Sequence, residues 1–149
     1  MTAHDRIPDF DDRLQRLAQR FAADAAVAAA YLYGSRARGD ARPGSDVDLA
    51  VILDAKRSPA ERWRRRLALL EAAAAELGSD AIDLVILEEA PAPLAHRVIR
   101  DGRLLVDTDP RRRVAVVEDV FRRYLDEAPL RRALDEALRA RIAEGRFAR

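Results

Sequence analysis

Blocks of apolar residues alternate with polar turns along this chain, and their spacing predicts helices and strands in alternation. In residues 9–28 the apolar side chains recur at three- and four-residue steps, which places them on one face of a helix. The apolar run 28–33 predicts a short buried strand, with a helix as the alternative because the run is rich in alanine. Residues 35–40 predict a short helix, which Gly39 ends before Pro43.

The strongest strand pattern covers residues 47–53, where side chains alternate between two faces. Asp46 and Asp48 are two positions apart and therefore fall on the same face. Residues 81–87 predict a further strand, in which Asp83 is the only centrally placed carboxylate. Both strands thus carry acidic side chains inside otherwise apolar runs.

The helix between these strands has clear end signals. Ser58 and Pro59 are typical of a helix start, and Gly78 is typical of a helix end. Its predicted apolar stripe comprises Ala60, Trp63, Leu67, Leu70, Ala74 and Leu77. We therefore expect Trp63 to lie in the core, with the four arginines around it solvated rather than forming an RNA-binding patch.

The C-terminal part is predicted to be mainly helical. The expected elements are a helix over 91–101, a short edge strand over 104–106, and a helical region over 110–143 with a bend before Pro129. The apolar residues of this last region are Phe121, Tyr124, Leu125, Leu130, Leu134, Leu138 and Ile142. We expect them to pack on the chain's own sheet, and the alternative is that they dock against a partner helix.

This order of elements predicts an α/β (α+β) fold in which helices pack on a small sheet. The length of 149 residues favours a single domain over 1–149, with a core of about 9–107 and a helical tail of about 110–145. The sequence lacks the Gly-x-Gly-x-x-Gly spacing of a dinucleotide-binding fold and the Lys-Ser/Thr of a P-loop.

Composition and charge exclude several classes of protein. A formal net charge of +1 provides no basic field, so we expect no direct nucleic-acid binding. The absence of cysteine excludes disulfides and thiolate metal sites. Residues 1–6 are polar, which argues against a signal peptide, and no apolar run approaches the ~20 residues of a membrane span. We therefore expect a cytoplasmic protein without a membrane partner.

Candidate chemistry gathers where the first strand ends, at Gly34 and Ser35. A glycine lets backbone N–H groups approach phosphate oxygens closely, and Ser35 adds a hydroxyl group. Arg36 and Arg38 on the predicted short helix are placed to neutralise phosphate charge. Of the two tyrosines just before this turn, we expect one in the core, and either could contact an adenine ring. The turn is therefore a candidate phosphate-binding site.

The paired carboxylates of Asp46 and Asp48 are candidate metal ligands. Two such charges about 6 Å apart repel by roughly 3 kcal/mol at an effective dielectric constant of ~20, and a divalent cation relieves that repulsion. Asp83 joins the pair if its strand neighbours theirs. Carboxylates together with substrate phosphates are the ligands that Mg²⁺ prefers, and three carboxylates can hold two such ions.

The two-part motif has a specific resemblance. Gly34-Ser35, then ten residues, then Asp46-x-Asp48, with Asp83 on a later strand, resembles the polymerase-β-type nucleotidyltransferase superfamily. The compact size is similar to that of its minimal nucleotidyltransferases, the MntA-type antitoxins that pair with HEPN toxins of the HepT type.

The resemblance carries expectations about fold, activity and partner. It implies a nucleotidyltransferase fold with a small mixed sheet, ATP as donor with Mg²⁺ (two ions), and AMP transfer to a hydroxyl group. In that family the hydroxyl belongs to a tyrosine of the toxin, whose ribonuclease activity is thereby silenced, so a hetero-oligomer is expected. Gly34 and Ser35 would bind phosphate, Asp46 and Asp48 would bind metal, and Asp83 would bind metal or activate the attacking hydroxyl.

Two other functions stay open at this point. The chain could neutralise a toxin by binding alone, with its helical tail against the partner. It could also transfer a nucleotide to a small molecule such as an aminoglycoside, although such enzymes usually add a substrate domain that this chain is too short to hold. A nucleic-acid polymerase is least favoured because no basic template groove is indicated.

Overall fold

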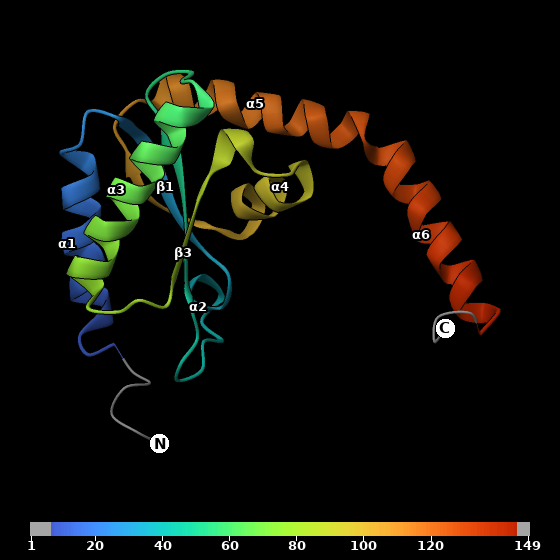
Figure 1. Cartoon of the computed structure of the whole chain (residues 1–149), viewed down its shortest axis with the longest axis horizontal. Coiled ribbons are helices and arrows are strands. Elements are labelled where there is room, and N and C mark those ends of the chain that lie inside the picture. The colour runs from blue at the N-terminus through green and yellow to red at the C-terminus, as the bar shows by residue number, and fades with distance from the viewer. Residues whose placement is uncertain (1–6, 146–149) are drawn as a thin grey trace.

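The computed structural model describes residues 7–145, and helices and strands alternate in it as the sequence predicts (Figure 1). The elements are α1 (Phe10–Ala22), β1 (Val27–Tyr33), α2 (Ser35–Arg38), β2 (Val47–Leu53), α3 (Pro59–Leu77), β3 (Ile82–Ile86), the 3-10 turn η2 (Leu87–Glu89), α4 (Ala92–Asp101), β4 (Arg103–Asp107), α5 (Pro110–Asp126) and α6 (Ala128–Ala143). The segment 1–6, for which we expect no signal peptide, lies outside the described residues. Within residues 7–145 no helix combines the length and apolar character that crossing a membrane requires.

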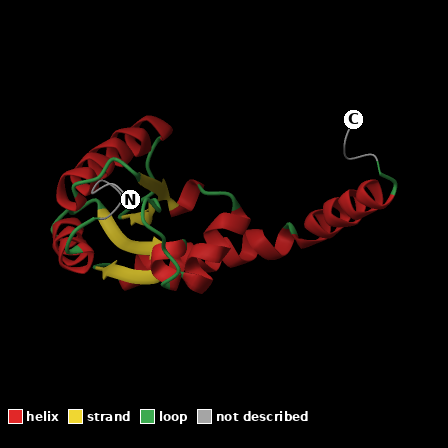
Figure 2. Cartoon of the chain, turned by 90° about the horizontal axis from the view of Figure 1, so that it is seen from below, coloured by secondary structure: helices red, strands yellow, loops and turns green. Residues whose placement is uncertain are grey.

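The four strands form one mixed sheet in the order β3-β2-β1-β4. β1 is antiparallel to both β2 and β4, whereas β2 and β3 are parallel and are connected through α3. Helices α1 and α3 cover one face of the sheet, and α4 and α5 lie on the other (Figures 1 and 2). This confirms the predicted α+β class and the small mixed sheet flanked by helices.

Side-chain alternation along β2 divides the core into two clusters. Leu49 and Val51 pack with α1 and α3, and the largest buried side chain on that side is Phe21. Ala50 and Ile52 pack on the opposite side with α4 and α5. The face that carries Ala50 is the one predicted to carry Asp48, so the acidic residues emerge on the α4 side of the sheet.

The first helix ends six residues earlier than predicted. α1 stops at Ala22, and the Asp24 carboxylate accepts a hydrogen bond from the Ala26 N–H at 2.9 Å, closing a local turn. An aspartate that bonds the backbone two residues ahead competes with helix continuation. The prediction of a helix to residue 28 was therefore wrong, and β1 begins at Val27 instead.

α3 begins and ends as predicted, but its predicted apolar stripe faces the core only toward the C-terminal end, where Leu77 is buried and Leu70 packs against the core. The Ser58 hydroxyl accepts from the Glu61 N–H, and Gly78 ends the helix in a left-handed conformation. The buried residues are Leu69, Ala73 and Leu77. Trp63 is 57% exposed and Leu67 is 44% exposed, so the expectation of a core tryptophan was wrong.

Two arginines account for the rotation of α3. The Arg66 Nε donates to the Leu84 carbonyl of β3 at 2.7 Å, and the Arg62 Nε lies 2.7 Å from the Glu89 carboxylate. These contacts turn the arginine side of α3 toward the sheet edge. Trp63 therefore points outward, where the Arg66 guanidinium lies 5.8 Å from its ring.

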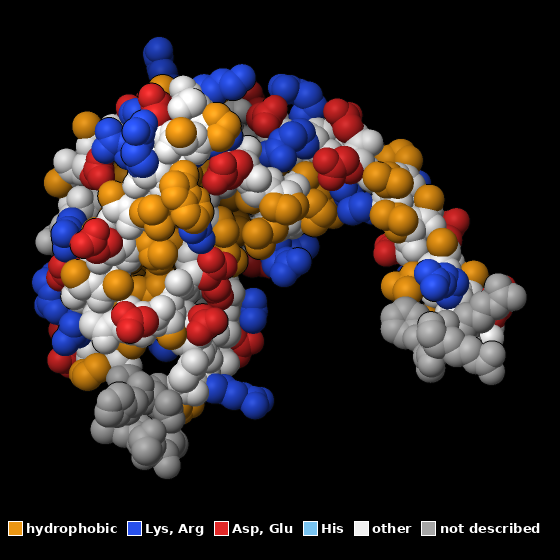
Figure 3. Space-filling view, viewed as in Figure 1, with side chains coloured by type: hydrophobic (Ala, Val, Ile, Leu, Met, Phe, Trp, Pro, Cys, Tyr) orange, Lys and Arg blue, Asp and Glu red, His pale blue; other side chains and the backbone are white. Residues whose placement is uncertain are grey.

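The helical tail bends where predicted, but most of its apolar residues do not pack on the sheet. α5 contributes Val116 and Val120 to the core, and α6 contributes no buried residue. The exposed residues of the predicted set are Phe121, Leu125, Leu130, Leu134, Leu138 and Ile142. The expectation that they cover the chain's own sheet was therefore wrong, because α6 leads away from the sheet (Figures 1 and 2) and carries apolar side chains on its surface (Figure 3).

Candidate active site

The centre of the site is the contact between the turn at Gly34 and the carboxylate of Asp48. Tyr33 and Asp48 are register neighbours on β1 and β2, so the turn after Tyr33 passes directly beside Asp48. A β-carbon on Gly34 would overlap Oδ2 of Asp48. Gly34 also has φ 71° and ψ −157°, a conformation that is essentially restricted to glycine. Both the backbone conformation and the space at this turn therefore require glycine.

A short helix, α2, follows this turn and is held by local contacts. The N–H groups of Ala37 and Arg38 donate to the Gly34 carbonyl, each at 3.2 Å. The Arg36 guanidinium donates to the Ser45 carbonyl at 3.2 Å and 2.8 Å and lies 4.7 Å from the centre of the Phe10 ring. Arg36 thus fixes α2 against the loop that leads into β2.

Three aspartates surround the entry to β2. Asp48 and Asp83 are register neighbours on the parallel strands β2 and β3, as predicted if these strands were adjacent. Burial raises the pKa of the Asp48 carboxyl, and the charges of Asp83 and Asp46 raise it further, against the opposing effect of Arg38. Asp46 is exposed, and Asp83 is 54% exposed with its carboxylate 3.8 Å from Arg66. The three carboxylates therefore repel one another at one end of the sheet.

This acidic set is a partial donor set for a metal ion. Among residues 7–145, no three Asp, Glu or His side chains converge as a preformed metal site. Oxygen donors that repel one another nevertheless suit Mg²⁺, which keeps several water ligands and usually takes one or two carboxylates together with substrate phosphates. The residues present therefore fit Mg²⁺ bound jointly with a phosphate ligand.

One cavity of about 320 Å³ joins the turn to Asp48. Its lining comprises Tyr33, Gly34, Ser35, Arg38, Asp48, Arg97 and Asp101. Of the residues predicted for the site, the structure brings Gly34, Ser35, Arg38 and Asp48 into this lining. Arg36, Asp46 and Asp83 lie outside it, the last two beside Asp48.

Tyr33 is one of the two tyrosines before the turn, and it stays protonated. Burial raises the pKa of its hydroxyl to about 12, with the Asp83 and Asp48 charges adding to the shift and Arg97 opposing it. A neutral phenol beside two carboxylates can donate a hydrogen bond. Tyr33 is thus a polar wall of the cavity.

Sequence reasoning missed Arg97 and Asp101 as lining residues. Both lie on α4, four positions apart, which is the spacing of one helix face. That spacing is visible in the sequence. What it does not reveal is that α4 packs beside the β1 turn, because this placement depends on long-range contacts of Ala95 and Val98 in the core.

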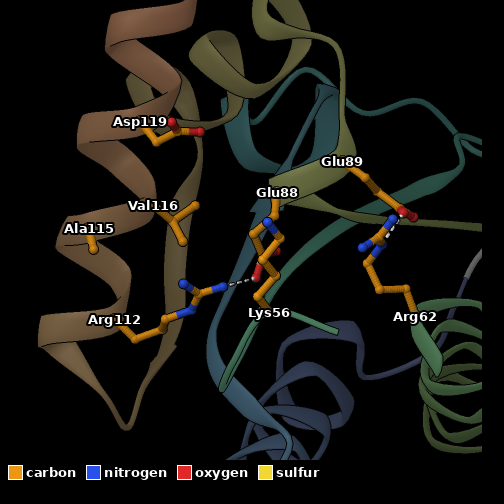
Figure 4. Close-up of a pocket in the computed structure, with 8 residues that line it drawn as sticks. All are labelled: Lys56, Arg62, Glu88, Glu89, Arg112, Ala115, Val116 and Asp119. Carbon is orange, nitrogen blue, oxygen red and sulfur yellow. Dashed lines mark hydrogen bonds and ion pairs between the residues drawn. The ribbon is translucent and has the colours of Figure 1, made fainter. Parts of the chain in front are cut away.

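A larger cavity, of about 490 Å³, lies beyond the other end of β2 (Figure 4). Its charged side chains largely neutralise each other, since Arg112 pairs with Glu88 at 3.2 Å and Arg62 with Glu89 at 2.7 Å. It contains no glycine turn and none of the three aspartates. The residues predicted for the site therefore lie at the smaller cavity and not at this one.

Comparison with known proteins identifies related folds. A family model described as polymerase beta nucleotidyltransferase matches residues 15–111, which include the glycine turn and all three aspartates. No curated protein matches the chain in a sequence search.

The solved structures that share this fold include two toxin–antitoxin complexes. One of them was determined with AMP-PNP. Its matching chain is 24% identical to this one, with a TM-score of 0.63, and the match covers 86% of this chain and 98% of that chain. The other is a tri-AMPylated Shewanella oneidensis HEPN toxin in complex with an MNT antitoxin. Its matching chain is 23% identical to this one, with a TM-score of 0.57, and the match covers 86% of this chain and 95% of that chain. At these identities the similarity establishes the fold.

Proposed function

The chain belongs to the polymerase beta nucleotidyltransferase family, and from this premise we propose that it transfers AMP from ATP to a hydroxyl group of a HEPN-type toxin and so acts as an antitoxin. The observation that carries the proposal is the contact of Gly34 with Asp48 inside one cavity. The contact supports the proposal because it brings the turn, which we propose binds phosphate, against a candidate metal ligand.

The turn and its helix bind the phosphates in this proposal. Gly34 exposes its backbone to the ligand, Ser35 offers a hydroxyl, and Arg38 supplies positive charge from the cavity wall. Arg36 acts indirectly, because its guanidinium is engaged by the Ser45 carbonyl and the Phe10 ring. Phosphoryl chemistry of this kind depends mainly on positioning and charge stabilisation.

The aspartates hold the metal in this proposal. Asp46 and Asp48 would bind Mg²⁺, and Asp83, beside Asp48, would bind metal or accept the proton of the attacking hydroxyl. When bound, Mg²⁺ neutralises the triphosphate and polarises the phosphorus that is attacked. Burial raises the pKa of the Asp48 carboxyl and the charges of Asp83 and Asp46 raise it further, which supports this role because a bound cation relieves the repulsion between the carboxylates.

The partner assignment is supported by the structural neighbours and by the surface of the tail. The similar folds come from toxin–antitoxin complexes, one with AMP-PNP and one with an AMPylated HEPN toxin. The exposed apolar stripe of α6 favours a protein partner over a small-molecule acceptor. We place this pair in the cytoplasm.

A second candidate function is neutralisation by binding alone. The observation that favours it is the same stripe, because α6 has no buried residue and a lone helix of this length is only marginally stable in water. Under this alternative the aspartates would not matter for toxin neutralisation.

The test is AMP transfer with the toxin that co-purifies with the chain. We expect label from ATP marked at the α-phosphate to appear on the toxin with Mg²⁺ and to be absent with a chelator. Asp46→Asn combined with Asp48→Asn should abolish labelling while leaving a folded protein. Equal labelling by this double variant and the wild type would overturn the proposal, and neutralisation without any labelling would favour binding alone.

A further inference from the structure

Arg97 lines the cavity beside Gly34 and Asp48, but it belongs to a different element than the residues of the turn and α2. Ser35 and Arg38 come from α2, whereas Arg97 comes from α4. The positive charge of Arg97 partly opposes the rise in the pKa of the Tyr33 hydroxyl, and it adds to the lowering of the Asp101 pKa that the hydrogen bonds from Arg100 chiefly cause. The cavity therefore has a guanidinium in the α4 wall as well as in the α2 wall.

The other charges of the lining are largely engaged. Asp101 accepts two hydrogen bonds from Arg100, at 2.9 Å and 2.8 Å. Arg38 pairs with Asp40 at 3.3 Å. Within residues 7–145, the side chain of Arg97 forms neither a hydrogen bond nor an ion pair. Its guanidinium is therefore free to bind an anionic ligand in the cavity.

Arg97 also has no part in the packing of its helix. α4 is attached to the core by the buried residues Ala92, Ala95 and Val98. Arg97 itself is exposed. A long cationic side chain that lines a cavity, without a hydrogen bond or ion pair of its own among the described residues, is suited to binding a ligand.

The proposed reaction determines which anion needs a second guanidinium. The acceptor hydroxyl oxygen forms a bond to the α-phosphorus of ATP and gives its proton to a base, for which Asp83 is the candidate. The bond between this phosphorus and the oxygen bridging to the β-phosphate breaks, and its electron pair leaves with pyrophosphate. Negative charge therefore builds on the leaving pyrophosphate, beside carboxylates that repel it, and a guanidinium pairs well with phosphate oxygens.

We propose that Arg97 is a substrate-binding residue that contacts the β- and γ-phosphates of ATP and stabilises the departing pyrophosphate. This inference rests on the proposed function. Arg97 on α4 thereby adds a phosphate contact to those proposed for the turn and α2.

The test compares three variants with the wild type, all in complex with the co-purifying toxin. Arg97→Ala should weaken binding of AMP-PNP with Mg²⁺ by at least about tenfold and should raise the KM for ATP, with the KM for the toxin unchanged. Arg97→Lys should recover part of the affinity because it keeps the charge and loses the bidentate geometry. Arg111→Ala, which removes an exposed arginine of α5 outside this lining, should match the wild type.

The outcomes separate this inference from the proposed function. Unchanged AMP-PNP affinity in Arg97→Ala, an equal loss in Arg111→Ala, or an effect confined to the KM for the toxin would overturn the role of Arg97. Failure of the wild type to label any protein would overturn the proposed function, while the AMP-PNP measurement would still decide whether Arg97 binds the phosphates. Equal melting temperatures of the variants would confirm that the changes are not structural.

Discussion

The carboxylate of Asp48 occupies the space that a side chain on Gly34 would need. This relationship yields a sharp prediction, because a second glycine serves as its control. Gly34→Ala should force the turn and the carboxylate apart and reduce AMP transfer by about a hundredfold, the cost typical of misplacing a reacting group by an ångström.

The control is Gly39→Ala. Gly39 also has a positive φ, 79°, but no atom lies within 4 Å of the position that its β-carbon would take. Gly39→Ala should lose about 1 kcal/mol of stability from backbone strain. Gly34→Ala should lose more, because its backbone conformation is restricted to glycine and its β-carbon would overlap Oδ2 of Asp48. Only Gly34→Ala should lose activity, and equal transfer rates for the two variants would show that the contact with Asp48 is unimportant.

The orientation of α3 predicts very different losses of stability when two of its large side chains are truncated. Leu69 is 3% exposed, so Leu69→Ala should cost about 2–5 kcal/mol in the free energy of unfolding. Trp63 is 57% exposed, so Trp63→Ala should cost under about 1 kcal/mol, mainly its contact with Arg66. Urea denaturation of both variants measures these free energies of unfolding. A larger loss in Trp63→Ala than in Leu69→Ala would instead support the buried tryptophan that was predicted from the sequence.

Glu88 gives the protein a pH-dependent term in stability. Its Oε1 accepts from the Leu53 N–H at 2.9 Å and from Arg112 at 3.2 Å, yet burial prevails and raises the pKa of the Glu88 carboxyl above its usual 4.5. A carboxyl whose pKa is raised on folding contributes stability that is present below the unfolded pKa and lost as pH rises through the folded pKa.

Glu88→Gln removes this term. Its stability relative to the wild type should therefore increase as pH rises from about 4 through the raised pKa of the folded-state Glu88 carboxyl, as measured by denaturant unfolding at each pH. Glu89→Gln changes a more exposed neighbour, 41% exposed in its side chain, and is the matched control. A difference between Glu88→Gln and the wild type that is independent of pH, or that decreases as pH rises, would contradict this account of Glu88.

The exposed stripe of α6 separates the two antitoxin mechanisms. Leu134 and Leu138 are 60% and 43% exposed, so replacing both with serine should change stability by less than about 0.5 kcal/mol per residue. If the stripe docks the toxin, the double variant should co-purify with less of it. If the serine double variant neutralises the toxin as well as the wild type does, and the Asp46→Asn, Asp48→Asn variant does not, then binding through α6 is not the mechanism of neutralisation.

Local signals in the sequence were sufficient for much of this fold. The alternation in residues 47–53 predicts both faces of β2, and Ser58 with Pro59 predicts the start of α3. The glycine turn and the carboxylate at position 48 were also identified from residue type and spacing. These features depend on neighbours in the chain, which is why pattern reasoning detects them.

The errors arose where tertiary contacts decide between similar alternatives. α3 is apolar on more than one side, and the contacts of Arg62 and Arg66 select the buried face. The path of α6 away from the sheet and the approach of Arg97 to the cavity likewise depend on how whole helices pack. No spacing within a single element records those placements.

The central claim is AMP transfer to a protein hydroxyl, and the most direct test is the mass of the toxin itself. A HEPN-type toxin co-expressed with this chain should gain one or more AMP units, on a hydroxyl-bearing residue, in its intact mass spectrum. The same toxin co-expressed with the Asp46→Asn, Asp48→Asn variant should keep its unmodified mass. A toxin that is neutralised but unmodified by the wild-type chain would contradict the account.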